Sequence, residues 1–174
     1  MKLLPVPLRR WVYRIGYLVL QTAWFFTHPR ISGVKCVVTH GDGVLLVRHT
    51  YGHRQWDLPG GTMEGGEPPI EAARREMREE LGVRREDWTS LGQLLMGIGP
   101  AWHTLHLFSL ELASPEIKLD PGELATSAWF TLELLPPDLS AYVVPIIARA
   151  GDQFRVRRPP AAATPTQSSP GACS

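Results

Sequence analysis

The residues of this sequence that could do chemistry are three glutamates, Glu76, Glu79 and Glu80, at positions i, i+3 and i+4 of one predicted helix. At about 100° per residue they lie together beside the apolar stripe that must face the core. Like charges at this spacing cost a helix a few tenths of a kcal/mol per pair, so a surface helix gains nothing from grouping them. A divalent cation would reverse that cost. Oxygen ligands with no His or Cys among them suit Mg²⁺, with Mn²⁺ as a substitute.

The same glutamates have a simpler interpretation as a solvated acidic face of the helix. Charged clusters on helices usually have no other role, and three nearby arginines could neutralise them, namely Arg74, Arg75 and Arg78. On the three carboxylates alone, the two interpretations are equally good. The residues around them decide between the two.

These surrounding residues form a longer pattern. It runs Gly61, five residues, Glu67, seven residues, Arg75-Glu76-Met77, one residue, Glu79-Glu80, one residue, Gly82-Val83. Position for position, this resembles the Nudix box of the MutT-like hydrolases. Seven identities at about 7% usage each have a chance probability on the order of 10⁻⁸ per starting position. The resemblance is close over residues 60–83 and looser over residues 33–135.

The resemblance implies a fold and a metal site. Nudix domains are α+β proteins, α/β/α sandwiches with a mixed β-sheet, and their box is a loop–helix–loop element. By similarity, the ligands are the box glutamates and a preceding glycine carbonyl, and neighbouring residues support the loop. Here the ligands are Glu76, Glu79, Glu80 and Gly60, and the supporting residues are Gly61, Glu67 and Arg75. A glycine pair fits because it lets the main chain approach an ion closely and adopt positive φ.

The resemblance also implies a reaction, the Mg²⁺-dependent hydrolysis of a diphosphate linkage between a nucleoside and another group X. The metal would offset charge at phosphorus and acidify a bound water that attacks in line. A carboxylate must take the proton of that water. In similar proteins it is a box glutamate, here Glu76 or Glu79, or one from a distant loop, where Glu123 lies. The alternative is that Glu123 is an ordinary surface acid.

Other residues support weaker hypotheses about a small-molecule nucleotide substrate. Arg48, Arg54 and His103 could meet phosphate or ribose, and Trp102 could stack on a base. Such residues on strands and loops more often have structural roles. The substrate stays open among ADP-ribose, dinucleoside polyphosphates, oxidised nucleotides and nucleotide sugars. The alternative to an enzyme is a module that binds a nucleotide without cutting it, and the intact box glutamates argue against that alternative.

Periodicity predicts the elements that position these residues. We expect strands at 34–40, 44–49, 88–98, 102–112 and 128–130, the box helix at 68–81, a helical turn at 132–135 and a last helix at 140–150. The turn Gly41-Asp42-Gly43 predicts a hairpin, and Gly82 ends the box helix. A bend is expected at Gly99-Pro100. Pro145 is expected either to kink the last helix or to mark its start.

Bulk properties bound the organisation of the chain. With 174 residues, 44% of them hydrophobic, and a formal net charge of +1, the sequence fits one domain, at 31–150, and gives no electrostatic reason to expect nucleic-acid binding. Two cysteines suggest no disulfide framework, so we expect a cytoplasmic protein. The tail, 151–174, is rich in Pro, Ser, Thr and Ala and is predicted to be disordered.

The N-terminal segment, 1–30, contains a predicted amphipathic helix at residues 8–26. Its apolar stripe consists of Trp11, Ile15, Leu18 and Phe25. Arg14 and Gln21 interrupt the segment, and its apolar runs are shorter than the ~20 residues that a bilayer core requires. We expect the helix to pack on its own domain or on a second copy in a homodimer. A helix lying on a membrane surface is the less favoured alternative.

Overall fold

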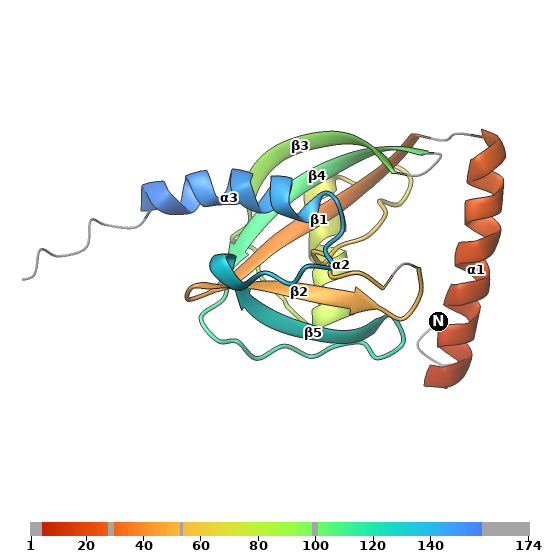
Figure 1. The fold of residues 1–174 in the computed structure, drawn as a ribbon, viewed down its shortest axis with the longest axis horizontal. Helices are drawn as coiled ribbons and strands as arrows, with labels where there is room; N and C mark the ends of the chain where they lie inside the picture. The colour runs from red at the N-terminus through yellow and green to blue at the C-terminus, as the bar shows by residue number, and fades with distance from the viewer. Residues whose placement is uncertain (1–4, 28–29, 53, 99–100, 158–174) are drawn as a thin grey trace, which may run out of the picture.

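The centre of the molecule is a five-stranded mixed sheet with the strand order β3-β4-β1-β2-β5 (Figure 1). The structure, a computed structural model, describes residues 5–27, 30–52, 54–98 and 101–157. The strands are β1 (Arg30–His40), β2 (Gly43–His49), β3 (Thr89–Ile98), β4 (Ala101–Glu111) and β5 (Leu124–Thr131). Central β1 pairs in parallel with β4, whereas the other three pairs are antiparallel. The predicted α+β fold with a mixed sheet is therefore confirmed.

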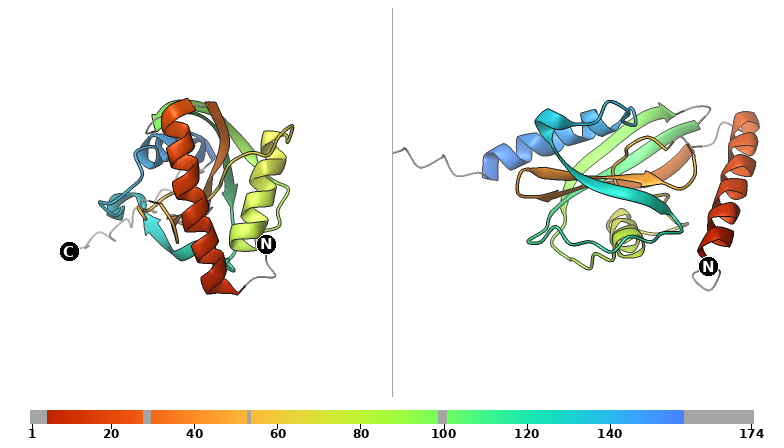
Figure 2. Two further views of the ribbon diagram at one scale, coloured as in Figure 1. Left: turned by 90° about the vertical axis from the view of Figure 1, so that its right-hand side faces the viewer. Right: turned by 60° about the horizontal axis from the view of Figure 1, so that its bottom comes forward.

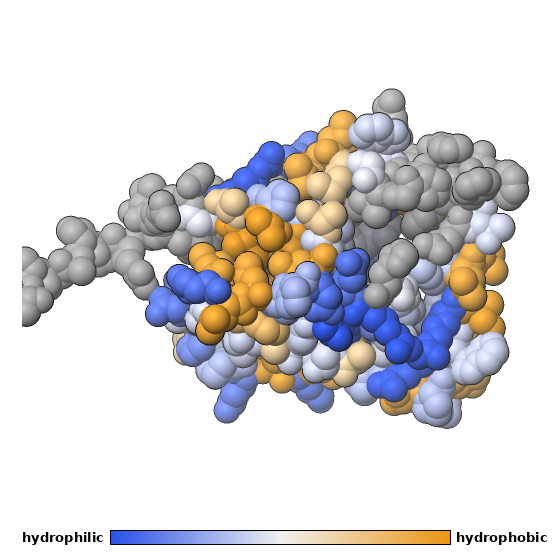
Figure 3. All heavy atoms as spheres, in the orientation of Figure 1, coloured by the Kyte–Doolittle hydropathy of each residue, from blue (hydrophilic) through white to orange (hydrophobic). Residues whose placement is uncertain are grey.

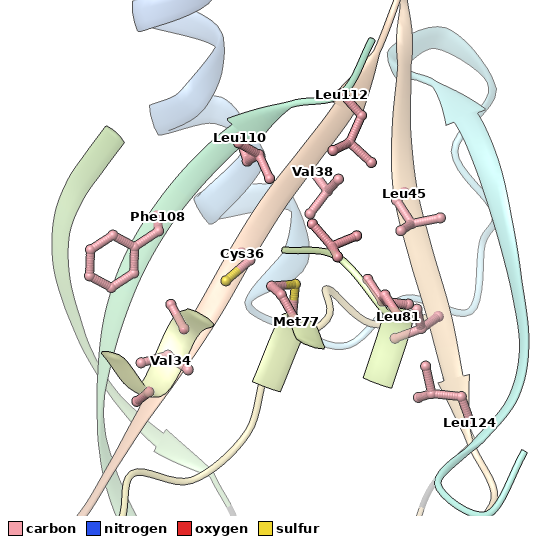
Figure 4. Close-up of a cluster of buried hydrophobic side chains, with 14 residues drawn as sticks. Val34, Cys36, Val38, Leu45, Met77, Leu81, Phe108, Leu110, Leu112 and Leu124 are labelled. Carbon is pink, nitrogen blue, oxygen red and sulfur yellow. The ribbon is translucent and has the colours of Figure 1, made fainter. Parts of the chain in front are cut away.

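Two helices cover the two faces of this sheet. Helix α2 (Pro69–Leu81) lies on one face and α3 (Val143–Arg157) on the other (Figures 1 and 2). Val34, Cys36 and Val38 of β1 lie in the same core cluster as Met77 and Leu81 of α2 (Figure 4), while Val37 belongs to the cluster of α3. Burial of each such side chain contributes roughly 1.5–3 kcal/mol. Because both faces are covered, the central strands are apolar along most of their length.

The predicted elements are all present, with shifted ends. Strand β5 begins at Leu124, four residues before the predicted strand. Leu124 is buried in the core, but the polar residues that follow it hide the start of the strand in the sequence. The helical turn is the short helix η1 (Leu132–Leu134). Helix α3 begins at Val143, not Ser140, and continues past residue 150 to Arg157. Pro145 lies in its first turn, where a missing N–H breaks no helical bond, so this proline marks the start. The Gly99-Pro100 bend and residues 158–174 lie outside the described residues.

Helix α1 (Val6–Thr27) crosses the end of the sandwich where β2 finishes and β5 begins (Figures 1 and 2). It packs on its own domain through polar contacts. Arg9 donates two hydrogen bonds to Asp120, at 3.0 and 2.9 Å, and Arg14 Nε donates to the Thr50 carbonyl at 3.2 Å. The ring of Tyr17 lies 5.9 Å from the ring of Tyr51.

The face of α1 that makes these contacts is not the predicted apolar stripe. Trp11, Ile15 and Leu18 are 64%, 47% and 62% exposed, and apolar residues follow the outer side of the helix (Figure 3). The expected packing of the helix on its own domain is present, but it is made by the polar side, because periodicity finds the apolar side of a helix and not the polarity of the surface it meets. Packing of the apolar stripe on a second copy stays a prediction. The side chain of Phe25 lies outside the described residues. No helix in the described part of the chain is both long and apolar enough to cross a membrane.

Candidate functional site

Helix α2 determines where the three glutamates lie. It begins after Pro68 and ends at Gly82, whose left-handed conformation (φ 68°) lets its amide bond back to the Met77 carbonyl. Its apolar face is buried in the core, and two of the glutamates sit at the edge of that face. Glu76 and Glu80 are only 8% and 2% exposed. The side chain of Glu79 is 42% exposed, so this residue meets solvent.

The Gly60-Gly61 loop is pressed between β1 and these carboxylates. The carbonyl of Gly61 accepts a hydrogen bond from the Val34 amide at 2.8 Å. The amide of Gly60 donates to Glu80 Oε2 at 3.0 Å. A Cβ on Gly60, where φ is 129°, would lie 2.3 Å from the Val34 carbonyl oxygen, and one on Gly61 would lie 2.5 Å from Glu76 Oε1. Only glycine fits at position 60, and a side chain at position 61 would displace the Glu76 carboxylate, so the main chain runs directly against both carboxylates.

Arg75 joins the loop to the helix. Its guanidinium donates to both carboxylate oxygens of Glu67, at 2.9 and 3.0 Å, and to Glu76 Oε1 at 2.8 Å. Glu79 Oε2 is 3.7 Å from the same group. Such a bidentate pair fixes direction as well as distance. Arg75 therefore orients Glu76 and ties it to the loop, the arrangement expected of supporting residues.

Burial makes these carboxyl groups costly to ionise. It raises the pKa of Glu76, although Arg75 opposes the shift, and it raises the pKa of Glu80 well above the usual carboxyl value. The negative charge of Glu76 raises the pKa of Glu80 further, and the positive charge of Lys35 offsets only part of the shift. Within the described residues, no group of three or more His, Cys, Asp or Glu is arranged as a cation site. The carboxylate oxygens suit Mg²⁺ or Mn²⁺ as ligands. Such an ion would supply the positive charge that compensates the two buried carboxylates.

The loop before β5 brings Glu123 to the same end of α2. The amides of Lys118 and Asp120 donate to the carbonyls of Leu81 and Glu80, each at 2.9 Å, so the loop caps the last turn of the helix. The negative charge of Glu123 contributes to the raised pKa values of Glu76 and Glu80. Glu123 thus lies close enough to the box glutamates to interact electrostatically with them.

Tyr13 of α1 is a contact of this site that sequence reasoning missed. Its hydroxyl donates to Glu123 Oε1 at 2.6 Å. Burial and the bond to Glu123 raise the pKa of Tyr13, so it keeps its proton. The available signal was the i, i+4 spacing of Arg9, Tyr13 and Tyr17, a second stripe beside the apolar one.

The weaker candidates lie in two different regions, one at the end of β2 and one on β4. Arg48 pairs with Asp138 and lies over the ring of Trp56, 4.6 Å from its centroid. Arg54 is exposed near the end of β2, with a positive φ of 53°. Trp102 and His103 are neighbours on β4, and side chains alternate along a strand, so these two point to opposite faces of the sheet. They cannot line one side of a single pocket.

Comparisons with known proteins identify the family of this chain. The family model for the NUDIX domain matches residues 29–150. An ADP-ribose pyrophosphatase of Mycobacterium tuberculosis is 34% identical over 114 residues, covering 62% of this chain and 55% of that protein. The NAD-capped RNA hydrolase NudC of Pseudomonas aeruginosa is 35% identical over 113 residues, covering 63% of this chain and 40% of that protein. The chain thus spans about half the length of these relatives or less.

A solved structure shows the same architecture. The MutT NUDIX hydrolase from Burkholderia pseudomallei superposes with a TM-score of 0.64 at 23% identity, covering 69% of this chain and 97% of that chain. At this identity the likeness concerns the fold alone. The family model extends from the start of β1 into α3 and includes the whole box with its glutamates and glycines. The chain belongs to the Nudix family.

Proposed function

We propose that this protein is a Mg²⁺-dependent hydrolase that splits the diphosphate linkage of a nucleoside diphosphate attached to a group X. The observation that carries the proposal is the burial of Glu76 and Glu80 against the Gly60-Gly61 main chain, with raised pKa values. Two buried carboxylates beside each other destabilise a fold unless a cation compensates them. A bound divalent ion with substrate phosphates would do so.

Each residue of the site has a task in this reaction. Glu76, Glu79 and Glu80, with the Gly60 carbonyl, would hold the ion, which supplies Lewis acidity toward the phosphate oxygens and acidifies water. Arg75 keeps Glu76 turned toward the loop. Glu123 accepts the proton of the attacking water. Its Oε1 is bonded to Tyr13, which leaves Oε2 for the proton.

We propose ADP-ribose as the first substrate to examine. One relative is named ADP-ribose pyrophosphatase and another NAD-capped RNA hydrolase. Both names point to an adenine nucleotide joined through its diphosphate to a second ribose. All three box glutamates are present, which argues against the alternative of binding without hydrolysis.

A panel of nucleotides with Mg²⁺ tests the proposal, with wild type compared against Glu79→Gln. Glu79 is half-exposed, so the substitution changes the charge without disturbing the core. We expect turnover to fall at least about tenfold, a loss of about 1.4 kcal/mol of transition-state stabilisation. Exposed Glu116→Gln is the matched control and should retain full turnover. Equal turnover by Glu79→Gln would remove Glu79 from the site, and tight nucleotide binding without turnover by wild type would favour a binding module.

A further inference from the structure

We propose that a pocket between α1 and the facing ends of β2 and β5 binds a phosphate group other than the two at the scissile linkage. The pocket has a volume of about 320 Å³, and its polar lining consists chiefly of Arg10, Arg14, Arg48, Arg54, His49 and Thr50. Two of these arginines come from α1, which lies outside the segment that matches the Nudix family model. This proposal rests on the proposed function in one respect: the assignment of the phosphate to a substrate requires that the protein is a hydrolase.

The lining of this pocket has an excess of positive charge. None of the described residues that line it is acidic. Arg48 has a carboxylate partner, Asp138, which lies outside the lining. Arg10 and Arg14 donate instead to main-chain carbonyls, those of Pro121 and Thr50, at 3.0 and 3.2 Å. Four guanidinium groups around one cavity repel one another. A bound phosphate would replace this repulsion by attraction, and its oxygens fit the forked donors of arginine.

Two buried polar atoms of the lining lack partners. Arg48 Nε and His49 Nδ1 are shielded from solvent and make no hydrogen bond with the described residues. Arg48 is kept in place by the Trp56 ring and by Asp138, so its Nε does not simply turn away to find a partner. Buried donors and acceptors are normally paired, and unpaired ones mark places where a ligand or water completes the site. A bound anion would satisfy the free Arg48 donor.

The backbone conformation of Arg54 also supports a ligand site. Among the described residues, Arg54 is the one non-glycine residue with a positive φ, 53°. Residues other than glycine, asparagine and aspartate rarely adopt this backbone conformation. Backbone strain of this kind concentrates at functional sites. Arg54 is exposed and is in no ion pair with a described residue, so the domain itself gives no reason for keeping an arginine there. A ligand in the pocket would give one.

The pocket is hydrogen-bonded to the loop that carries Glu123, the candidate general base. The Thr50 amide donates to the Glu123 carbonyl, and the Thr50 hydroxyl donates to the Gly122 carbonyl, both at 2.8 Å. On α1, Arg10 and Arg14 lie on either side of Tyr13, which holds Glu123. A phosphate in the pocket therefore lies next to the reacting end of the site. It suits a phosphate carried by the group X, and the other source of the same chemistry is free inorganic phosphate.

Calorimetric titration with inorganic tripolyphosphate tests the pocket directly. With EDTA present, the metal site carries only negative carboxylates and repels the probe. We expect wild type to bind, and Arg10→Gln and Arg54→Gln each to bind about tenfold more weakly, as for loss of one charge-assisted hydrogen bond. Exposed Arg84→Gln, outside the pocket, is the matched control and should bind like wild type. No binding by wild type, or equal binding by all four proteins, overturns the proposal. Arg54 is exposed, and its replacement by glutamine removes no ion pair within the described residues, so a folding defect is not the expected cause of weaker binding.

Turnover with Mg²⁺ then identifies the source of the phosphate, with ADP-ribose compared against ADP-ribose phosphorylated on its terminal ribose. A substrate-borne phosphate predicts that Arg54→Gln raises KM about tenfold for the phosphorylated compound alone. A free phosphate predicts that inorganic phosphate changes ADP-ribose turnover in wild type but not in Arg54→Gln. If wild type turns over ADP-ribose and binds tripolyphosphate yet neither effect appears, the pocket holds an adventitious ion only and the proposal fails. Tripolyphosphate binding with no turnover of any nucleotide would contradict the proposed hydrolase alone.

Discussion

The three box glutamates have different surroundings although they share one helical turn. Glu80 is bonded to the Gly60 amide, Glu76 to Arg75, and Glu79 meets solvent. The sequence predicted that the three would lie together at the edge of the buried face, because 3.6 residues per turn requires it. It could not predict which of them would be buried, since that depends on how the loop from Pro59 to Gly61 lies along β1.

Replacing Glu80 with glutamine should stabilise the protein when no metal is present. At neutral pH an ionised Glu80 opposes folding because burial raises its pKa. We expect Glu80→Gln to raise the free energy of unfolding in EDTA by about 0.5–2 kcal/mol, measured by urea denaturation. The gain should shrink as the pH falls, because a protonated Glu80 carries no charge either. We also expect Mn²⁺ to raise the melting temperature of wild type but not that of the variant. A loss of stability in EDTA, compared with Glu116→Gln, would contradict this account.

The hydrogen bond from Tyr13 to Glu123 should affect catalysis through Glu123 alone. Without it the carboxylate of Glu123, the proposed base, would be free to rotate away from the attacking water. We expect Tyr13→Phe to lower kcat about three- to tenfold while KM changes little, as for loss of an interaction made in the transition state. In a Glu123→Gln background the same substitution should have no further effect. Additive losses in the double variant would show that Tyr13 acts by some other route.

At the scale of elements, the accuracy of the predictions followed the local signals. Helix α2 was predicted almost to its ends because Pro68 and Gly82 are themselves start and stop signals. Strand β5 was predicted too short because its residues after Leu124 alternate between polar and small types without an apolar face. The parallel pairing of β1 with β4 has no local signal at all, since it joins residues far apart in the chain.

A buried ion pair holds the segment that leads into the glycine loop. Lys35 of β1 donates to Asp57 Oδ2 and to the Leu58 carbonyl, each at 2.9 Å, and Tyr142, just before α3, donates to the same oxygen of Asp57. Burial alone would lower the pKa of Lys35, but Asp57 raises it above its usual value. One oxygen of Asp57 thus joins three elements behind the site.

Removal of one partner from this pair should be strongly destabilising. Lys35→Met leaves Asp57 buried and unpaired, so we expect the free energy of unfolding to fall by about 3–5 kcal/mol. The double variant Lys35→Met/Asp57→Leu should recover part of that loss because it leaves no isolated charge. Urea denaturation measures both. The exposed pair Arg85–Asp87 is the control, and Arg85→Met should change stability little. A small loss in Lys35→Met would mean that water compensates Asp57.

At the scale of the whole molecule, α1 has two different sides. Its inner side bonds the loop from Asp120 to Glu123, and its outer side leaves Trp11, Ile15 and Leu18 in solvent. The homodimer and membrane-surface predictions both concern that outer side and stay predictions. Sequence patterning could predict an amphipathic helix there but not which side would meet the domain, because the contact surface is made by residues of two distant loops.

Leu18→Glu separates the two outer-side predictions. We expect wild type to form dimers in sedimentation velocity and the variant to be monomeric, because a buried glutamate would replace an apolar contact. Turnover should be unchanged, since Leu18 faces away from the site. Leu95→Glu, an equally exposed leucine on β3, is the control and should leave the dimer intact. A monomeric wild type that floats with anionic lipid vesicles would favour the membrane alternative instead.

The parallel ladder between β1 and β4 also sets the order in which the molecule can form. Partners such as Arg30 and Trp102, or Val38 and Leu110, are separated by the hairpin, the glycine loop, α2 and β3. As the chain leaves the ribosome, β1 and β2 emerge early, yet the central strand keeps one open edge until β4 has been synthesised. Long-range pairing of this kind is slow and exposes strand edges to aggregation. The free edge of β1 is thus exposed to aggregation for as long as β4 is still being made.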